Sequence, residues 1–283
     1  GALILRGGGD PFLSGDDLQA MAKALEAAGI KSVDGPFLYD ATTLIEVPQI
    51  NAGQPEAAGY NTGVSALALN FNRIRLDWQN GKKGPFAAAT AVSEKLTLPL
   101  DAIGLAFAEE DLPGPFVRAG AAGEDSWLLS KGLSAKGSDW LPVGDPSLVA
   151  AHVFRAVAAA EGLDLPEPQA GETPEDAREI ARHGSIPLDE IARGVLRYSN
   201  NLSAELIGLA ASLSVTGISL SLEDSAMSLV GWWRLRLPDA DWEAFALENH
   251  SGLSSKSRAT PRQIVTILED AAEPVGGADF HGL

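Results

Sequence analysis

The chain has 283 residues, of which 45% are hydrophobic, so it is long enough to build more than one packed core. Its 38 acidic residues against 21 Lys and Arg give a formal charge of -17, which argues against nucleic acid as a partner. No apolar run approaches the roughly 20 residues of a membrane span. The absence of cysteine excludes disulfides, thiolate nucleophiles and Cys-based metal sites.

The first half of the chain is predicted to be rich in β-strands. Alternating apolar residues, such as Leu67, Leu69 and Phe71, are typical of half-buried strands. One helix is expected after Ser14, a capping residue, and it should end at Gly29. Its apolar stripe is Leu18, Met21, Ala22 and Leu25. The expected strands are ALILR near the start, PFLYD at 36–40, ALALNFNRIRLDW at 66–78, KLTLPL at 95–100 and SWLLSKG at 126–132.

From residue 143 the sequence changes to capped helical patterns, so we predict a division into a β-rich region, 1–142, and a helical region, 143–283. The β-rich region is expected to form two subdomains. Proline at the first helical position and capping boxes are both signals of a helix start. They occur at Asp145-Pro146, Thr173-Pro174, Pro187, Ser221 with Asp224, and Thr260-Pro261 with Gln263.

Several common kinds of site are poorly supported. The four histidines, at 152, 183, 250 and 281, lack HExxH spacing, so no metal site is predicted. The segment GGGD at 7–10 lacks the glycine order of a phosphate-binding loop. The charged run from Glu172 to Glu179 is interpreted as a solvated helix start.

Two segments carry a more specific signal: RYSNNLSAE at 197–205 and ENHSGLSSKSRATPRQIVTIL at 248–268. Their order and spacing resemble those of the class C low-molecular-mass penicillin-binding proteins, the peptidase S13 type. In that family Tyr-Ser-Asn-Asn-Leu-x-Ala-Glu is followed about fifty residues later by Asp-Gly-Ser-Gly-Leu-Ser and a Thr-Pro helix start. The segments at 2–30 and 59–78 are similar to the family's inserted region, so the resemblance covers nearly the whole chain.

The resemblance implies an α+β fold: the helical part of a β-lactamase-like transpeptidase domain with inserted β-rich domains. It implies a periplasmic serine-type D-Ala-D-Ala carboxypeptidase or endopeptidase that acts on peptidoglycan stem peptides through an acyl-enzyme and is acylated by β-lactams. Such an enzyme needs no metal or organic cofactor. Its partners would be those peptides and drugs, with no membrane span. No pattern in the sequence specifies an oligomeric state.

Individual roles follow residue by residue from the same resemblance. Ser199 would relay protons, Asn201 would hold the substrate amide, and Asn200 would be a spacer. A helix cap is the other interpretation of Ser199. Ser251, in the downstream loop, is a candidate for substrate binding. Asp40 matches an acidic residue that faces the cleft in the family and could bind an amine, although an Asp that ends a strand is an equally good interpretation.

Two motifs of the family are absent from these 283 residues. No serine stands three residues before a lysine, and Ser93/Lys95, Ser134/Lys136 and Ser254/Lys256 have a spacing of two, which places the pair on different faces of a helix. No Lys-Thr-Gly occurs, and His250-Ser251-Gly252 imitates it only loosely. We expect both motifs to lie outside the given sequence and the chain alone to be inactive. The alternative is a non-catalytic binding or scaffold protein of the cell envelope.

Overall fold

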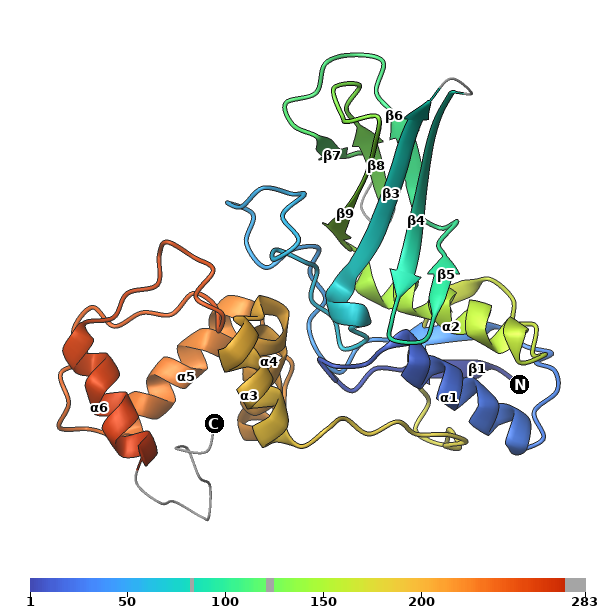
Figure 1. The fold of residues 1–283 in the computed structure, drawn as a ribbon. Helices are drawn as coiled ribbons and strands as arrows, with labels where there is room; N and C mark the ends of the chain where they lie inside the picture. Colours follow the sequence, from blue (N-terminus) through green and yellow to red (C-terminus); the bar gives the residue numbers. More distant parts are fainter. Residues whose placement is uncertain (82–83, 121–124, 273–283) are drawn as a thin grey trace. The chain divides into compact units, whose positions relative to one another are not determined.

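The structure is a computed structural model that describes residues 1–81, 84–120 and 125–272. It divides into two compact units, Gly1–Ser185 and Ile186–Leu283. Among the described residues, the strands and the helices α1 and α2 lie in the first unit, and the helices α3 to α6 lie in the second (Figure 1). Each unit is described by itself below.

The base of the first unit is a parallel sheet of three short strands with two helices that pack against each other. The strand order is β1 (Leu3–Arg6), β2 (Phe37–Asp40), β10 (Pro168–Ala170). The helices are α1 (Gly15–Ala27) and α2 (Pro146–Ala160), which lie near this sheet in Figure 1. The predicted strands at 2–6 and 36–40 are thereby confirmed.

Both helices begin where the sequence predicts. The side chain of Ser14 accepts a hydrogen bond from the N–H of Asp17, whose carboxylate binds back to the backbone of Ser14. This capping box satisfies two N–H groups that the first helical turn leaves without partners. Asp145 caps α2 through the N–H of Leu148, with Pro146 as the first helical residue.

Two further sheets complete the first unit. One is antiparallel, in the order β5 (Thr97–Pro99), β4 (Gly84–Val92), β3 (Arg73–Gly81), β9 (Lys136–Pro142). In the other, β8 (Ser126–Leu129) lies between β6 (Gly104–Phe107), which is parallel to it, and β7 (Phe116–Arg118), which is antiparallel. Long β3 and β4 ribbons dominate this part of Figure 1.

The prediction of one strand over 66–78 was wrong in its first half. A short turn, η1 (Asn70–Asn72), interrupts it, and all three residues have left-handed φ values of 50°, 57° and 51°. Asparagine tolerates this conformation better than most residues. Here the Asn72 side chain also accepts from Leu69 N–H and donates to Gly63 C=O. These two buried hydrogen bonds hold the turn.

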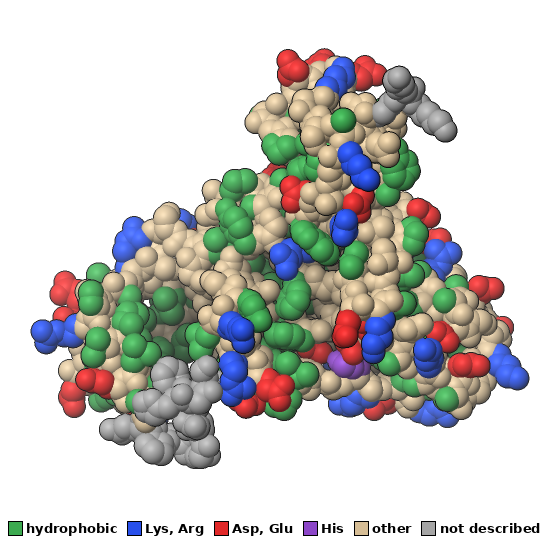
Figure 2. Space-filling model, in the orientation of Figure 1, with side chains coloured by type: hydrophobic (Ala, Val, Ile, Leu, Met, Phe, Trp, Pro, Cys, Tyr) green, Lys and Arg blue, Asp and Glu red, His purple; other side chains and the backbone are tan. Residues whose placement is uncertain are grey.

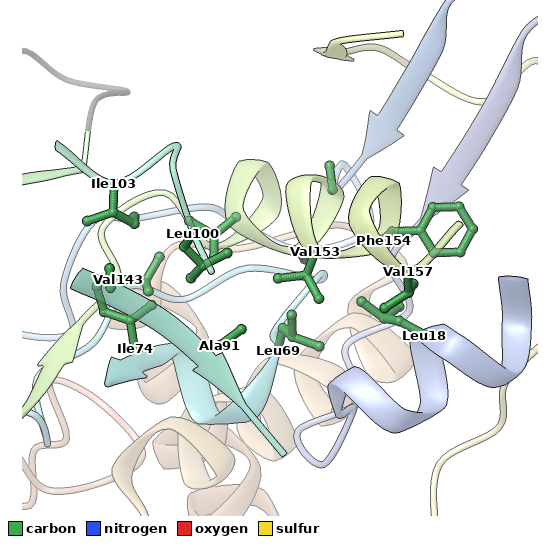
Figure 3. Close-up of a cluster of buried hydrophobic side chains, with 14 of the residues drawn as sticks. Leu18, Leu69, Ile74, Ala91, Leu100, Ile103, Val143, Val153, Phe154 and Val157 are labelled. Carbon is green, nitrogen blue, oxygen red and sulfur yellow. The ribbon is translucent and has the colours of Figure 1, made fainter. Parts of the chain in front are cut away.

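One apolar core joins the helices and sheets of the first unit (Figure 3). Leu18 of α1 meets Val153, Phe154 and Val157 of α2, while Leu69, Ile74, Ala91, Leu100, Ile103 and Val143 come from the sheets and their connections. Removal of this much apolar surface from water is the main stabilising contribution. It also explains why α2 belongs to the first unit.

The compact units therefore divide the chain differently from the predicted boundary at 142/143. The change in composition at residue 143 is real, since helices follow it, but α2 packs into the core of the first unit and the units meet at 185/186. A sequence pattern reports a change in secondary structure more directly than a change of core.

A helix expected after Thr173-Pro174 does not form, which corrects that prediction. Residues 171–187 contain no helix. Tertiary contacts hold this segment instead: Thr173 N–H donates to Asp40 at 2.8 Å, Ile180 packs against the core, and His183 pairs with Asp10 at 3.2 Å. These contacts stabilise the non-helical segment. They outweigh its intrinsic helix propensity, because such propensities differ by only about a few tenths of a kcal/mol per residue.

The second unit consists of α3 (Leu188–Tyr198), α4 (Asn201–Thr216), α5 (Leu222–Arg236) and α6 (Pro261–Ala272). The predicted starts at Pro187, at Ser221 with Asp224 and at Thr260 with Gln263 are confirmed. Val230, Trp242 and Phe245 form a small core. The mixture of sheets and helices over both units confirms the predicted α+β class.

The surface mixes charges of both signs with apolar side chains, and apolar side chains are visible on the helical unit in Figure 2. Exposed examples there include Leu196 of α3, Val215 of α4 and Leu235 of α5. Within the ranges that the structure covers, no helix combines the length and the apolar character that a membrane crossing requires.

Candidate functional site

Ser199 lies at the turn between α3 and α4, the centre of the first sequence motif. Its backbone is left-handed, with φ 52° and ψ 47°, and its N–H closes α3 by donating to Val195 C=O at 2.8 Å. The residue is exposed, and its hydroxyl has no hydrogen-bond partner among the residues that the structure describes. A side chain in a left-handed conformation costs about 1–2 kcal/mol relative to glycine. The turn therefore presents a free hydroxyl at some cost in stability.

Asn200, rather than Ser199, caps the following helix. Its side chain accepts a hydrogen bond from Ser203 N–H at 3.0 Å, and Asn201 is the first residue of α4. The prediction that Asn200 is only a spacer is therefore incomplete, because it also fixes where α4 begins. Ser199 and Asn201 flank this cap. The positions of these two residues do not test the proton relay assigned to Ser199 or the substrate contact assigned to Asn201, and both roles stay predictions.

The inner face of α4 holds the helix in place and carries one charge. Leu202, Leu206 and Leu209 are buried, whereas Leu213 is half-buried. Glu205 lies among them with no exposed surface. A carboxylate in such a place must be well hydrogen-bonded, because an isolated buried charge is very costly.

Glu205 meets that requirement through the second motif. One carboxylate oxygen accepts from the backbone N–H of His250 at 3.0 Å and the other from that of Ser251 at 2.9 Å. The 249–252 loop is thereby tied to α4, so the structure brings Ser251 together with the helix that Asn201 begins. Sequence reasoning missed Glu205. The signal available was a glutamate at helical spacing among the apolar residues Leu202, Leu206 and Leu209.

His250 adds a second connection between the loop and the helices. Its Nε2 lies 2.7 Å from the hydroxyl of Ser225, which donates to the hydroxyl of Ser212 at 2.7 Å; Ser212 in turn donates to a backbone carbonyl. In this arrangement both serine hydrogens are used, so a ring that carries its proton on Nε2 donates to the Ser225 hydroxyl. Burial lowers the pKa of His250, and the charge of Glu205 opposes that shift.

Gly208 makes this position of His250 possible. The imidazole lies so close to the helix backbone that a Cβ on Gly208 would overlap the ring. The related family motif has glycine where this chain has His250. Gly208 and His250 therefore depend on each other in the packing of this chain.

The end of the same loop is held by Glu248. Its carboxylate accepts from the hydroxyl of Ser254 and pairs with the ammonium group of Lys256. The hydrogen bonds from Lys256 and Ser254 lower the pKa of Glu248. Ser254 and Lys256 thus share one carboxylate and do not form a nucleophile and base pair, in agreement with their spacing.

Asp40 lies in the first unit, at the end of β2, and is 2% exposed. One oxygen accepts from Thr42 N–H at 3.0 Å and its hydroxyl at 2.6 Å, and the other from Thr173 N–H at 2.8 Å. Burial alone would raise the pKa of Asp40, but these hydrogen bonds lower it to about 2. This geometry suits the strand-ending interpretation, and a role in substrate binding stays a prediction.

Of the remaining histidines, the structure describes His152 and His183, which lie apart from any metal-binding cluster of described residues. His152 lies on α2 and His183 pairs with Asp10 and Asp17, while His281 is outside the described residues. In the part of the chain that the structure covers, no three His, Asp or Glu residues are placed to hold a metal ion.

Comparison with known proteins agrees with the motifs. Residues 1–280 match the D-Ala-D-Ala carboxypeptidase 3 (S13) family. A D-alanyl-D-alanine carboxypeptidase from Actinomadura sp. (strain R39) is 27% identical over 295 residues, covering 95% of this chain and 52% of the relative. The chain thus spans about half the length of this curated relative.

The fold is similar to that of penicillin-binding protein 4 (dacB) from Haemophilus influenzae, with a TM-score of 0.75 and 17% identity over 96% of this chain and 61% of the other. A second structure of that protein, in complex with a novel β-lactam, has a TM-score of 0.69 and 16% sequence identity. This match covers 96% of this chain and 60% of the other. These similarities confirm the predicted fold, and the family match confirms the resemblance inferred from the motifs. The chain belongs to the D-Ala-D-Ala carboxypeptidase 3 (S13) family.

Proposed function

We propose that the whole protein is a periplasmic serine-type D-Ala-D-Ala carboxypeptidase or endopeptidase. It would cleave peptidoglycan stem peptides through an acyl-enzyme and be acylated by β-lactams. The family match over residues 1–280 supports the substrate class. The observation that carries the site is the exposed hydroxyl of Ser199, which a left-handed turn holds directly before α4 and to which no described residue is hydrogen-bonded.

In this proposal Ser199 transfers a proton between the nucleophile and the leaving amine. Such a group must lie in water-accessible or substrate-accessible space and must not be consumed by a structural hydrogen bond. Asn201 would pair its amide with the substrate backbone. Ser251 would contact the substrate from a loop whose position depends on Glu205. No Ser-x-x-Lys occurs in these 283 residues, so the acylation step is proposed for the whole protein.

The test is acylation by a fluorescent penicillin. We expect the whole protein to form a covalent adduct and its Ser199→Ala variant to react about 100- to 10,000-fold more slowly, the usual contribution of a general acid or base. Ser221→Ala is a matched control, because Ser221 caps α5 in the same unit and its loss should affect stability only. Absence of any adduct with the folded whole protein would favour the non-catalytic scaffold. A stoichiometric adduct on the 283-residue chain alone would contradict the proposed need for a Ser-Lys pair.

A further inference from the structure

A cavity of about 520 Å³ opens in the first unit, and none of the residues assigned above is among its lining residues. It lies where the start of α1, the η1 turn, the end of β4 and strands β3 and β9 meet. Its size falls in the range of about 300–1,000 Å³ that is typical of small-molecule sites. The residues that matter for its chemistry are Phe71 and Trp140, the donors Asn70 and Arg73, and the acids Asp16 and Glu94.

The sheet register explains why Arg73 and Trp140 lie on one face. Ile74 of β3 pairs with Leu141 of β9, and both are buried at about 1% exposure or less. Side chains alternate along a strand, so the neighbours Arg73 and Trp140 must point to the opposite face, where they are diagonal partners. Trp140 is accordingly 42% exposed.

Phe71, one of the aromatic residues that line the cavity, is held in a fixed position. Phe71 has a left-handed φ of 57° and packs edge-to-face with Phe12 at 5.4 Å between ring centroids. Arg73 lies over the Phe71 ring at 5.9 Å. The Asn70 side chain ties this turn to α1 by accepting from Gly15 N–H at 3.2 Å. A side chain in this conformation persists only where its surroundings hold it, and such positions cluster at ligand sites.

The polar groups that line the cavity include hydrogen-bond donors and acceptors that could bind a ligand. Within the described ranges, no hydrogen bond or ion pair engages the half-buried guanidinium of Arg73 or the amide nitrogen of Asn70. The buried hydroxyl of Ser93 also lacks a partner there. On the acceptor side, Asp16 accepts from the backbone N–H of Lys95, and Glu94 is exposed.

We propose that this cavity binds a saccharide. A sugar ring has an apolar C–H face that can pack on Phe71 and Trp140, while its hydroxyls can both accept from Arg73 and donate to Asp16. The lining carries charges of both signs, Arg73 beside Asp16 and Glu94, so a ligand that offers both hydrogen-bond donors and acceptors matches it better than an ion of one sign does. An uncharged ligand with many hydroxyls suits the whole lining. The inference goes beyond the proposed function, because binding here requires no acyl transfer.

The experiment is calorimetric titration of the full chain with chitotetraose, an uncharged oligosaccharide, with tryptophan fluorescence as a second readout. We expect saturable binding with a millimolar or tighter Kd. Trp140→Ala and Arg73→Met should each weaken it by about tenfold or more. Trp232→Ala is the matched control, since Trp232 is 43% exposed, close to the 42% of Trp140, but lies on α5.

Circular dichroism establishes whether each variant is folded. If Trp140→Ala does not fold, Glu94→Ala replaces it, because this side chain is exposed and its loss should weaken binding without affecting the core. The proposal is overturned if the folded chain shows no saturable binding of chitotetraose, or if folded variants of the cavity bind as tightly as the unaltered chain. Neither result depends on penicillin acylation, so the proposed function is tested separately.

Discussion

The buried carboxylate of Glu205 accepts a hydrogen bond from the backbone N–H of Ser251 at 2.9 Å, across 46 residues of sequence. Its second oxygen accepts from His250 N–H. One side chain therefore joins the two motifs by which the family was recognised. A buried acceptor of this kind positions a loop more firmly than a surface contact does, because its loss leaves N–H groups unsatisfied.

Glu205→Gln should destabilise the chain by about 1–3 kcal/mol, because one of the two loop N–H groups would face an amide NH₂ instead of an oxygen. In the whole protein, acylation should slow because the 249–252 loop is displaced. Urea unfolding and acylation rates measure the two effects. Glu243→Gln is the control, since Glu243 is exposed in the same unit. Unchanged stability of Glu205→Gln would contradict the arrangement.

Ser199→Gly should raise the free energy of unfolding by about 1 kcal/mol, because glycine adopts the left-handed conformation without a Cβ clash. Ser199→Ala should change stability by less than about 0.5 kcal/mol, since the hydroxyl makes no capping bond. Both variants of the whole protein should lose acylation alike. Thermal unfolding beside acylation rates separates these effects. A large loss of stability in Ser199→Ala would return Ser199 to the role of a cap.

Asn200→Ala should cost about 0.5–2 kcal/mol of stability through loss of the α4 cap. This differs from the expectation for a mere spacer. Asn200→Asp keeps the side-chain acceptor and should restore most of the stability, as measured by urea unfolding. Equal stability of both variants would show that the hydrogen bond to Ser203 N–H contributes nothing.

Gly208→Ala should destabilise the chain although alanine favours helices by about 1 kcal/mol over glycine. The new methyl group would overlap the imidazole of His250 and displace the loop. In the double variant with His250→Gly the overlap is gone, so Gly208→Ala should then be neutral or stabilising. A double-mutant cycle of unfolding free energies measures this coupling. Additive effects would contradict the contact.

Stability should also depend on pH through His250. Its folded-state pKa is lowered by burial below the ordinary value of 6.5, against the opposing charge of Glu205. The unfolded chain then binds the proton more readily, so stability is full above the unfolded pKa and falls as pH drops below it, until the folded pKa is reached. The difference in unfolding free energy between the unaltered chain and His250→Gln should vary over this window. A flat difference would overturn the prediction.

Local chemistry in the sequence determined much of this protein. Capping boxes at Ser14 and at Thr260, and the cap at Ser221, need only residues three positions apart, so they were predictable and are present. The two ordered motifs likewise identified the family. A pattern can predict such features because their partners lie within one helical turn.

Tertiary structure decided the rest. The segment after Thr173 stays extended because Asp40 and the core bind it, and the strand at 66–78 breaks because Asn72 is held by buried groups of Gly63 and Leu69. The role of Glu205 depends on a loop 45 residues away. Ser199 offers a free hydroxyl because Asn200 takes the cap. Each outcome depends on hydrogen bonds or burial between distant segments, and no local pattern contains that information.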